Sequence, residues 1–406
     1  MTTTSTSTEV IEELKKQLDN DQKLAELLKD SLQQARTTAD KKLRKPLFTA
    51  LAWPTTIPDY LDYLTTFSEW KPRQDAEAAW SDDKGGYQEV YDRLCHFYYL
   101  IDQKVTADDN RIVQNDPWFK EWLVRFTKAW GSFLDTTASF SDEQLKSFED
   151  DAPRYRVQDS MVDGKPNEPS GWLTFNQFFA RELNPGLRPI TDPEHNATVT
   201  LPADCIYKKQ YHIEADSEIH PTGDPLRLKL THEVTTIPQL LSEKSEYGKK
   251  FAKGTFVHYF LAPYSYHRFH TPVAGRVKEC FPIHANTYLD VTIDGNGQFD
   301  APDNSTDGYE FTQARGVIVI DTADSPYGDI GLVAIVPVGM AQVSSVKMTM
   351  TVGAQVPKGE EFGYFLFGGS DIILLFQEGK TPEIDPTDGY HHYGTSISVP
   401  PAETDY

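Results

Sequence analysis

A glycine-glycine-serine step separates two apolar runs in the stretch FLFGGSDIILLFQEG, residues 365–379. A plain β-hairpin would carry Asn-Gly or Asp-Gly at such a turn. Here Ser370 follows Gly369, and a serine hydroxyl can attack the preceding carbonyl where glycine lets the backbone leave ordinary strand geometry. The resulting ester could eliminate, cleave the chain and leave a pyruvoyl group. The alternative is a tight turn or bulge with an inert serine.

Two histidines and one aspartate could assist such a serine. His267 and His270 lie three residues apart in YFLAPYSYHRFHTPVAGRV, and Asp204 lies in TLPADCIYKK. Histidine handles protons near neutral pH, and no further ligand is spaced near this pair for a metal ion. We therefore expect a relay in which Asp204 orients His270 and His270 deprotonates Ser370. The spacing leaves open whether the three side chains meet.

Decarboxylation of an amino acid needs a group that accepts the electrons left behind when CO2 departs. Pyridoxal phosphate on a lysine is the usual group. The sequence contains neither a convincing glycine-rich phosphate loop nor the α/β layout that would hold this cofactor. The other possible group is a pyruvoyl made from Ser370, which needs neither pyridoxal phosphate nor a metal, although this stretch alone favours the ordinary turn or bulge.

The elements that must position these residues change character along the chain. Residues 1–150 predict a helical domain, since apolar side chains recur at three- and four-residue spacing over residues 9–35. A second helix is expected where Asp116 can cap and Pro117 fits the first turn, with an aromatic face that suits packing against other helices. The polar residues 151–170 are interpreted as a linker.

Residues 171–381 form the expected catalytic core. It begins with a short helix that Thr174 can cap, and the pattern turns to strands from about residue 195. Because no long helix separates these strands, an antiparallel or mixed sheet is expected, and the fold class is α+β. Residues 382–406 are interpreted as an exposed acidic tail in which the pair His391-His392 is solvated.

Charge and composition restrict the partners. The formal net charge of −22 opposes binding to nucleic acid or to an anionic membrane surface. No stretch has the length and apolarity of a membrane span, and the N-terminal stretch lacks the apolar region of a secretion signal. The cysteines Cys95, Cys205 and Cys280 have the spacing of neither a disulfide framework nor a zinc site. A cytoplasmic protein with a small-molecule substrate is expected, and a homo-oligomer is compatible with the sequence.

Four ordered motifs between about residues 170 and 380 resemble those of the phosphatidylserine decarboxylase family. They are a Phe-rich helix ending in Arg-Pro-Ile (Phe175, Phe178, Phe179, Arg181, Leu183, Gly186, Arg188, Pro189, Ile190), the turn Pro202-Ala203-Asp204, the segment Leu261-Ala262-Pro263 with Tyr266-His267-Arg268-Phe269-His270, and Gly359-Glu360-Glu361 with Gly363-Tyr364-Phe365 and Gly369-Ser370. The resemblance implies self-cleavage between Gly369 and Ser370, aided by Asp204 and His270. It implies decarboxylation through a Schiff base on the pyruvoyl group, with His267 acting in that step.

Two positions depart from the family pattern. The motifs also do not decide between a free amino acid and a lipid as the substrate. Cys205 replaces a glycine after the aspartate, and Asp371 replaces a threonine after the serine. The charged N-terminal helices resemble the soluble branch of the family, which acts on free amino acids such as tryptophan. A free L-amino acid is therefore favoured as substrate over phosphatidylserine. A non-catalytic scaffold that keeps the fold is a further alternative.

Overall fold

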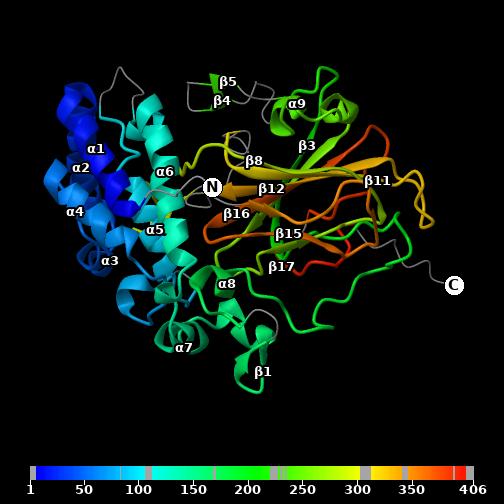
Figure 1. The fold of residues 1–406 in the computed structure, drawn as a ribbon, viewed down its shortest axis with the longest axis horizontal. Coiled ribbons are helices and arrows are strands. Elements are labelled where there is room, and N and C mark those ends of the chain that lie inside the picture. Colours follow the sequence, from blue (N-terminus) through cyan, green and yellow to red (C-terminus); the bar gives the residue numbers. More distant parts are fainter. Residues whose placement is uncertain are drawn as a thin grey trace. The chain divides into compact units, whose positions relative to one another are not determined.

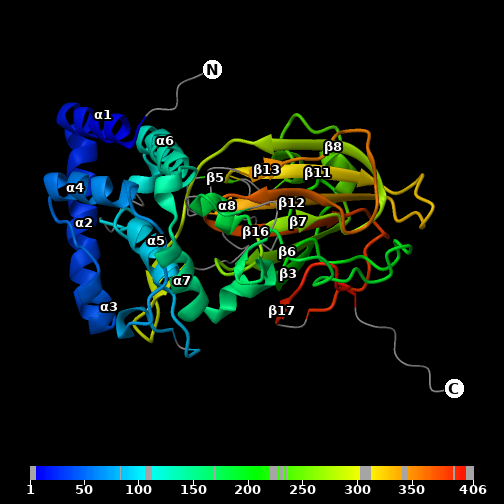
Figure 2. The same cartoon turned by 60° about the horizontal axis from the view of Figure 1, so that its bottom comes forward.

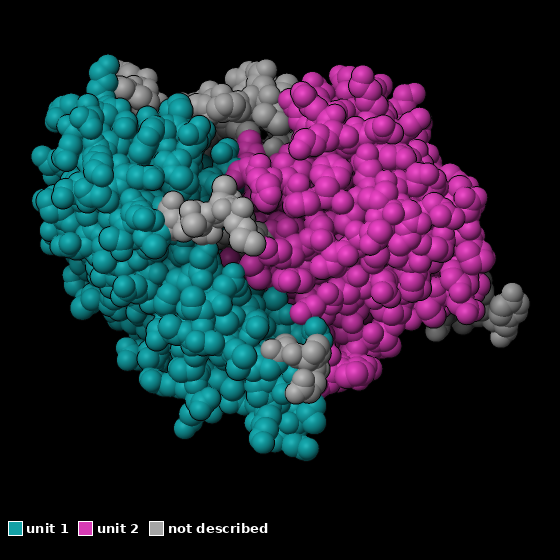
Figure 3. All heavy atoms as spheres, in the orientation of Figure 1, with its two compact units in different colours: residues 1–182, 286–303, 340–344 teal, residues 183–285, 304–339, 345–406 magenta. Residues whose placement is uncertain are grey.

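The computed structural model divides into two compact units, coloured separately in Figure 3. Unit 1 comprises residues 1–182, 286–303 and 340–344, and unit 2 comprises the remainder. The structure describes residues 6–82, 84–105, 112–167, 171–219, 227–228, 232–233, 236–301, 312–340, 346–386 and 389–398. The ends of the chain, and residues 168–170 of the expected linker, lie outside this described part.

Unit 1 is helical, as expected for the N-terminal region (Figure 1). Its helices are α1 (Ser7–Asn20), α2 (Gln22–Lys42), α3 (Lys45–Ala50), α4 (Ile57–Ser68), α5 (Glu89–Tyr99), α6 (Pro117–Leu134), α7 (Asp142–Asp150) and α8 (Phe175–Phe179). Two short hairpins accompany them, β1 (Met161–Val162) with β2 (Lys165–Pro166), and β9 (Thr292–Ile293) with β10 (Phe299–Asp300). The unit extends beyond the expected boundary at residue 150 and includes α8, which the sequence pattern predicts to be part of the core.

Side-chain caps decide where several of these helices begin. The Asp116 carboxylate accepts the Phe119 N–H at 2.9 Å, which starts α6 where the sequence predicts it. The expected helix over residues 9–35 is instead two helices that meet at Asp21. The N–H of Asp21 donates to the carbonyl of Gln17 at the end of α1. The Asp21 carboxylate accepts the N–H of Leu24 at the start of α2.

Unit 2 is built of strands (Figures 1 and 2). Its elements are β3 (Cys205–His212), β4 (Arg227–Leu228), β5 (His232–Glu233), α9 (Ile237–Leu240), β6 (Thr255–Leu261), β7 (Arg268–His270), β8 (Gly275–Ile283), β11 (Arg315–Asp321), β12 (Leu332–Met340), β13 (Val346–Met348), β14 (Gln355–Val356), β15 (Glu361–Phe365), β16 (Gly369–Phe376) and β17 (Tyr390–His391). The larger sheet has eight strands in the order β14-β8-β11-β12-β16-β6-β3-β17, and a smaller one has the order β13-β15-β7. The described registers are antiparallel, which confirms the α+β class.

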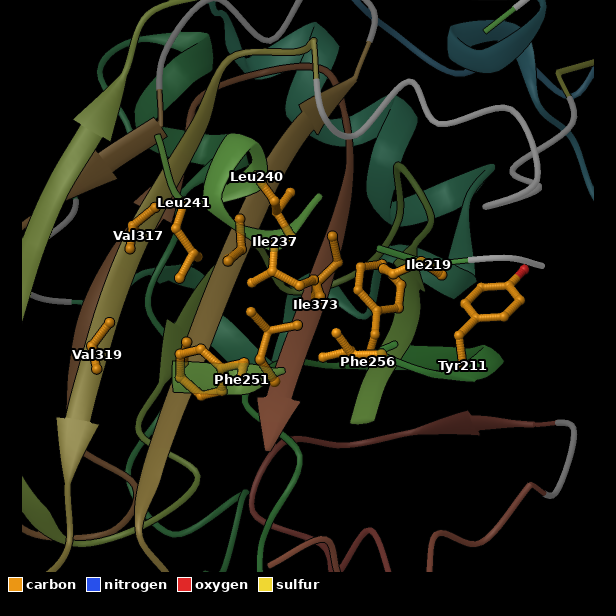
Figure 4. Packing of buried hydrophobic residues seen from close by; sticks show 14 of the residues in the cluster. Tyr211, Ile219, Ile237, Leu240, Leu241, Phe251, Phe256, Val317, Val319 and Ile373 are labelled. Carbon is orange, nitrogen blue, oxygen red and sulfur yellow. The ribbon is translucent and has the colours of Figure 1, made fainter. Parts of the chain in front are cut away.

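Strand β16 is an interior strand of the larger sheet, between β12 and β6. Its side chains from Ser370 to Phe376 are buried, so both faces of the strand are covered. A strand that is buried on both faces has a nearly continuous apolar sequence, which explains the run IILLF. On one face Ile373 joins Phe256 and the α9 side chains Ile237 and Leu240 in the core cluster shown in Figure 4.

The C-terminal region differs from the expected exposed tail. Strand β17 pairs with β3, and the N–H of Ile397 bonds to the carbonyl of Val199. Ile397 is 3% exposed, so this segment packs into unit 2, although His391 is exposed as expected. The alternation of Val346, Met348, Met350 and Val352 predicts a strand with these side chains on one face, but β13 ends at Met348 and Val352 is exposed. Within the described residues, no helix combines the length and apolarity needed to cross a membrane.

Candidate active site

Ser370 lies at the start of β16, opposite Leu261 of β6. Its hydroxyl oxygen is 3.3 Å from Nδ1 of His267, and both side chains are fully buried. His267 directly precedes β7, and its carbonyl accepts the N–H of Phe365 at 2.9 Å. Backbone pairing therefore holds both partners of this contact. We call Ser370, His267 and Pro263 the serine contact.

The second nitrogen of His267 sets the direction of that hydrogen bond. Nε2 lies 3.3 Å from the carbonyl oxygen of Pro263, which can only accept. When the ring is neutral, Nε2 therefore carries its hydrogen and Nδ1 offers its lone pair toward Ser370. The hydroxyl donates to Nδ1, which is the arrangement of a nucleophile and its general base.

The backbone before Ser370 has an unusual conformation. Gly368 has a φ of +151°, a region that residues with a Cβ rarely adopt. Leu366, Phe367 and Gly368 join the end of β15 at Phe365 to β16, which begins at Gly369. The paired glycines therefore let the chain enter the interior of the sheet while residue 370 faces His267.

His270 belongs to a second group of side chains. Its Nδ1 lies 3.0 Å from the Gly359 carbonyl and its Nε2 lies 3.3 Å from the Tyr266 hydroxyl. The Tyr393 ring stacks on the imidazole with the centroids 3.8 Å apart and the planes 1° apart. We call Arg188, Asp204, Tyr266, His270 and Tyr393 the His270 cluster.

The environment of His270 keeps its ring neutral. Burial lowers the pKa of His270 to about 4, and the nearby Arg268 cation acts in the same direction. The hydrogen bond to Gly359 opposes this shift, because it favours a protonated nitrogen. Burial also raises the pKa of Tyr266, so its hydroxyl keeps its proton and donates to Nε2.

Asp204 is held by Arg188 rather than by a histidine. The guanidinium approaches both carboxylate oxygens, with Nη2 2.6 Å from Oδ2 and Nε 3.1 Å from Oδ1. The backbone N–H of Tyr393 donates to Oδ1 at 2.8 Å. The two charged side chains are 1% and 3% exposed, so Asp204 is a buried and paired carboxylate.

The expected relay is therefore divided between the two groups. Among the described residues, Asp204 has no hydrogen bond to His270, and His267 rather than His270 contacts the Ser370 hydroxyl. Side chains three apart in an extended strand point to opposite faces, which separates His267 from His270. Asp204 and His270 are linked through Tyr393, which touches both.

Sequence reasoning missed two members of the His270 cluster. Arg188 is part of the Arg-Pro-Ile motif, but the motif does not indicate that Arg188 pairs with Asp204. Tyr393 lay in the presumed tail, where the aromatic stretch GYHHYG between two glycines was the available sign that this segment packs.

The departures at Asp371 and Cys205 have local explanations. Asp371 Oδ1 is 3.3 Å from Nε2 of His258, and both side chains are fully buried. Successive strand residues point to opposite faces, so Asp371 lies on the face that carries Ile373, away from Ser370. Cys205 starts β3 and is paired with His391, so its buried side chain is accommodated in the strand.

The residues present fit a group formed from Ser370. The serine is buried, its hydroxyl already faces an acceptor nitrogen, and glycines precede it. Within the part of the chain that the structure describes, no three His, Cys, Asp or Glu side chains are grouped so as to hold a metal ion.

Comparisons with known proteins agree with these features. The family model described as phosphatidylserine decarboxylase matches residues 175–397. A relative from Amanita muscaria, "Decarboxylase iboD", is 30% identical over 303 residues, which cover 69% of this chain and 82% of the relative.

Two further relatives carry names that include the lipid. "Phosphatidylserine decarboxylase proenzyme 2" of Oryza sativa is 28% identical over 289 residues, which cover 69% of this chain and 41% of that protein. "Phosphatidylserine decarboxylase proenzyme" of Fusobacterium nucleatum is 32% identical over 244 residues, which cover 59% of this chain and 70% of the relative. The match spans the serine contact and the His270 cluster, and the chain belongs to the phosphatidylserine decarboxylase family of pyruvoyl-dependent carboxy-lyases.

Proposed function

We propose that the chain cleaves itself between Gly369 and Ser370 and then releases CO2 from a free L-amino acid. The observation that supports this most directly is the buried contact of 3.3 Å between the Ser370 hydroxyl and Nδ1 of His267. An uncharged nucleophile needs a base that accepts its proton as it attacks, and this contact supplies one.

The proposed cleavage uses the residues of the serine contact. His267 Nδ1 takes the hydroxyl proton while Ser370 Oγ bonds to the carbonyl carbon of Gly369. The bond from that carbon to the Ser370 nitrogen then breaks, and the nitrogen takes a proton from the imidazolium. The product is an ester. Removal of the Cα proton of residue 370 then breaks the Cβ–Oγ bond, which releases the Gly369 carboxylate and leaves dehydroalanine. Water hydrolyses the imine form of this residue, which releases ammonia and leaves the pyruvoyl carbonyl. The sequence alone assigned the first step to His270, whereas the contacts favour His267.

In the mature enzyme, residue 370 supplies the carbonyl that binds the substrate amine and accepts the electrons left by CO2. The chain's own residues shape the site around it. Burial of Ser370 and His267 keeps bulk water away from the reacting atoms. We infer that His267 holds a proton next to residue 370 and returns it to the product carbon, and its contact with the Ser370 hydroxyl supports this role.

A free amino acid is the favoured substrate on electrostatic grounds. The chain carries a net charge of −22, and phosphatidylserine sits in an anionic surface. Like charges repel within a Debye length, about 8 Å at physiological salt. A zwitterionic amino acid meets no such opposition. Aromatic side chains are the first to test, because the chain itself is rich in aromatic residues.

Phosphatidylserine is the second candidate. The names of the rice and Fusobacterium relatives support it, since both are called phosphatidylserine decarboxylase proenzymes. The two candidates share the pyruvoyl chemistry and differ in whether the substrate is a soluble molecule or part of a lipid surface.

Intact-protein mass spectrometry tests the cleavage. We expect two chains, residues 1–369 and 370–406, from the unchanged sequence and one inactive chain from Ser370→Ala, which has no hydroxyl. Ser370→Cys keeps a nucleophile at this position and is expected to retain some cleavage. An active enzyme found only as one uncleaved chain would contradict the proposal.

Release of CO2 tests the substrate. Equal amounts of enzyme would receive L-tryptophan, L-phenylalanine, other free amino acids, or phosphatidylserine in mixed micelles. Turnover of the free amino acids is expected. Turnover of the lipid alone would establish the second candidate and leave the cleavage mechanism intact.

A further inference from the structure

The C-terminal segment of residues 389–398, which we call the docked segment, is fixed on unit 2 by its backbone. Strand β17 pairs with β3, the N–H of Leu201 bonds to Thr395, and the N–H of Gly394 bonds to Leu201. Gly394 has a φ of +85°, and a Cβ there would lie 2.8 Å from the Pro189 carbonyl oxygen. Only glycine fits this turn, which places Tyr393 against the core.

Tyr393 touches both functional candidates of the His270 cluster. Its ring lies flat on the His270 imidazole, with a centroid distance of 3.8 Å that leaves no room for water between the rings. Its N–H donates to Asp204, and its ring also stacks on Tyr266 at 5.6 Å. One residue of the docked segment therefore contacts the histidine, the carboxylate and the hydroxyl donor.

We propose that Tyr393 is a positioning residue, which fixes the plane of the His270 imidazole and the orientation of the Asp204 carboxylate. The inference rests on the proposed function, because the family resemblance that implies the self-cleavage also gives Asp204 and His270 a part in it. Tyr393 lies on the same side of the cleavage site as Ser370. The short chain of the mature enzyme would therefore supply both the reactive residue and the ring that holds His270.

The hydrogen bonds of His270 leave one motion of its ring weakly restrained. Hydrogen bonds from Nδ1 to Gly359 and from Tyr266 to Nε2 act in the plane of the imidazole. They resist sliding within the plane but only weakly resist tilting out of it. A parallel ring resists the tilt and excludes water from one face. Tyr393 therefore supplies the restraint that the hydrogen bonds lack.

Apart from the Tyr393 hydroxyl, the charged and titratable groups that face His270 are the same with and without this ring. Arg268 lies on its own strand, and Glu361 of β15 is opposite His270 in the register and paired with Arg268 at 2.7 Å. Asp204 with Arg188 lies before β3. Tyr266 and Tyr393 contribute hydroxyls. Loss of the Tyr393 ring would mainly hydrate the imidazole, and hydration stabilises its protonated form.

An NMR titration of the histidine ring tests this without relying on activity. The chain with Ser370→Ala is used throughout, so that every sample is one uncleaved chain, and His270→Gln identifies the His270 resonance. We expect a midpoint near the pKa of about 4 in this background. Adding Tyr393→Ala is expected to raise the midpoint by at least about one pH unit toward the ordinary 6.5. Tyr393→Phe keeps the ring and is expected to leave it unchanged.

Two further variants separate the ring from the segment and from folding. Tyr390→Ala loosens the same segment but removes no ring from His270, so its midpoint is expected to stay near that of the parent. Tyr393→Leu retains apolar packing if alanine prevents folding, and its midpoint is expected to lie between those of the parent and an exposed histidine. Equal midpoints in the parent, Tyr393→Ala and Tyr393→Leu, or an equal shift in Tyr390→Ala, would overturn the inference.

The cleavage rate completes the test in chains that retain Ser370. Tyr393→Ala is expected to slow cleavage by about tenfold or more, and Tyr393→Phe is expected to restore it. If the unchanged chain does not cleave, the proposed function fails, and the NMR midpoints still report on Tyr393. If it cleaves and Tyr393→Ala cleaves equally fast with an unshifted midpoint, the inference alone fails.

Discussion

His267 and His270 stand three residues apart in one extended segment and have opposite surroundings. His267 offers a lone pair to the Ser370 hydroxyl, while both nitrogens and one face of His270 are occupied by Gly359, Tyr266 and Tyr393. The difference follows from strand geometry, since an odd separation points two side chains to opposite faces. Proximity in sequence therefore does not make two histidines members of one relay.

The serine contact and the His270 cluster also have different roles. The serine contact holds a reactive hydroxyl against a base, which is a chemical arrangement. The His270 cluster holds a buried carboxylate, an arginine and a neutral imidazole in a fixed geometry, so its role is to orient side chains. Variants in each group test this division.

The largest effect is expected from His267→Ala. The variant removes the acceptor for the Ser370 proton, so turnover should fall by about 10²- to 10⁴-fold, and cleavage should slow as well. Cleavage is followed by mass spectrometry and turnover by CO2 release. His391→Ala removes an exposed histidine of β17 and serves as the control.

Cleavage of His267→Ala at the full rate, together with a loss of turnover, would contradict this division between the two groups. The serine contact would then serve decarboxylation alone, and the base for cleavage would lie in the His270 cluster. His270 would then be the base that deprotonates Ser370, as the sequence alone predicts.

The next effect is expected on stability, from Arg188→Met. The variant leaves the Asp204 carboxylate buried without its cation, which costs about 3–5 kcal/mol of the free energy of unfolding. Adding Asp204→Asn should recover part of this loss, because the charge is then gone as well. Urea denaturation in the Ser370→Ala background measures the change.

Arg125→Met is the control for this measurement. Arg125 and Glu13 form an exposed ion pair, whose loss should cost less than about 1 kcal/mol. A similarly small loss for Arg188→Met would show that the Asp204 carboxylate does not depend on its arginine.

The smallest effect on maturation is expected from Asp371→Asn. Asp371 adjoins the serine but points to the opposite face, so cleavage should proceed close to the normal rate. The contact with His258 is buried, and weakening it should lower the free energy of unfolding by about 1–3 kcal/mol. Asp329→Asn, in an exposed pair with Lys380, controls for the loss of one charge. Strongly impaired cleavage in Asp371→Asn alone would show that the face opposite Ser370 also acts on the serine.

Local features of the fold could be predicted from the sequence. Asp116 and Thr174 cap the expected helices, and the apolar run after Ser370 is an interior strand, because caps and burial are encoded in neighbouring residues. The break at Asp21 was missed, since the same residue that ends one helix starts the next and the apolar spacing continues through it.

The sequence identifies the residues of the candidate site but not which of them contact one another. Ser370, His267, His270 and Asp204 were all named from motifs, and the structure places each of them in one of the two buried groups. The partners Arg188 and Tyr393 come from segments 16 and 189 residues away from Asp204 along the chain. Such pairings depend on how strands and loops meet in space, which local periodicity does not record.

The place of β16 inside the larger sheet has a consequence for the life of the enzyme after maturation. Cleavage before residue 370 would leave a short separate chain whose first strand lies between β12 and β6. Before cleavage the protein can refold as a single molecule. Afterwards, unfolding releases the short chain, and recovery becomes a second-order encounter that depends on concentration. Maturation would thus exchange reversible folding for a lifetime set by the rate of unfolding.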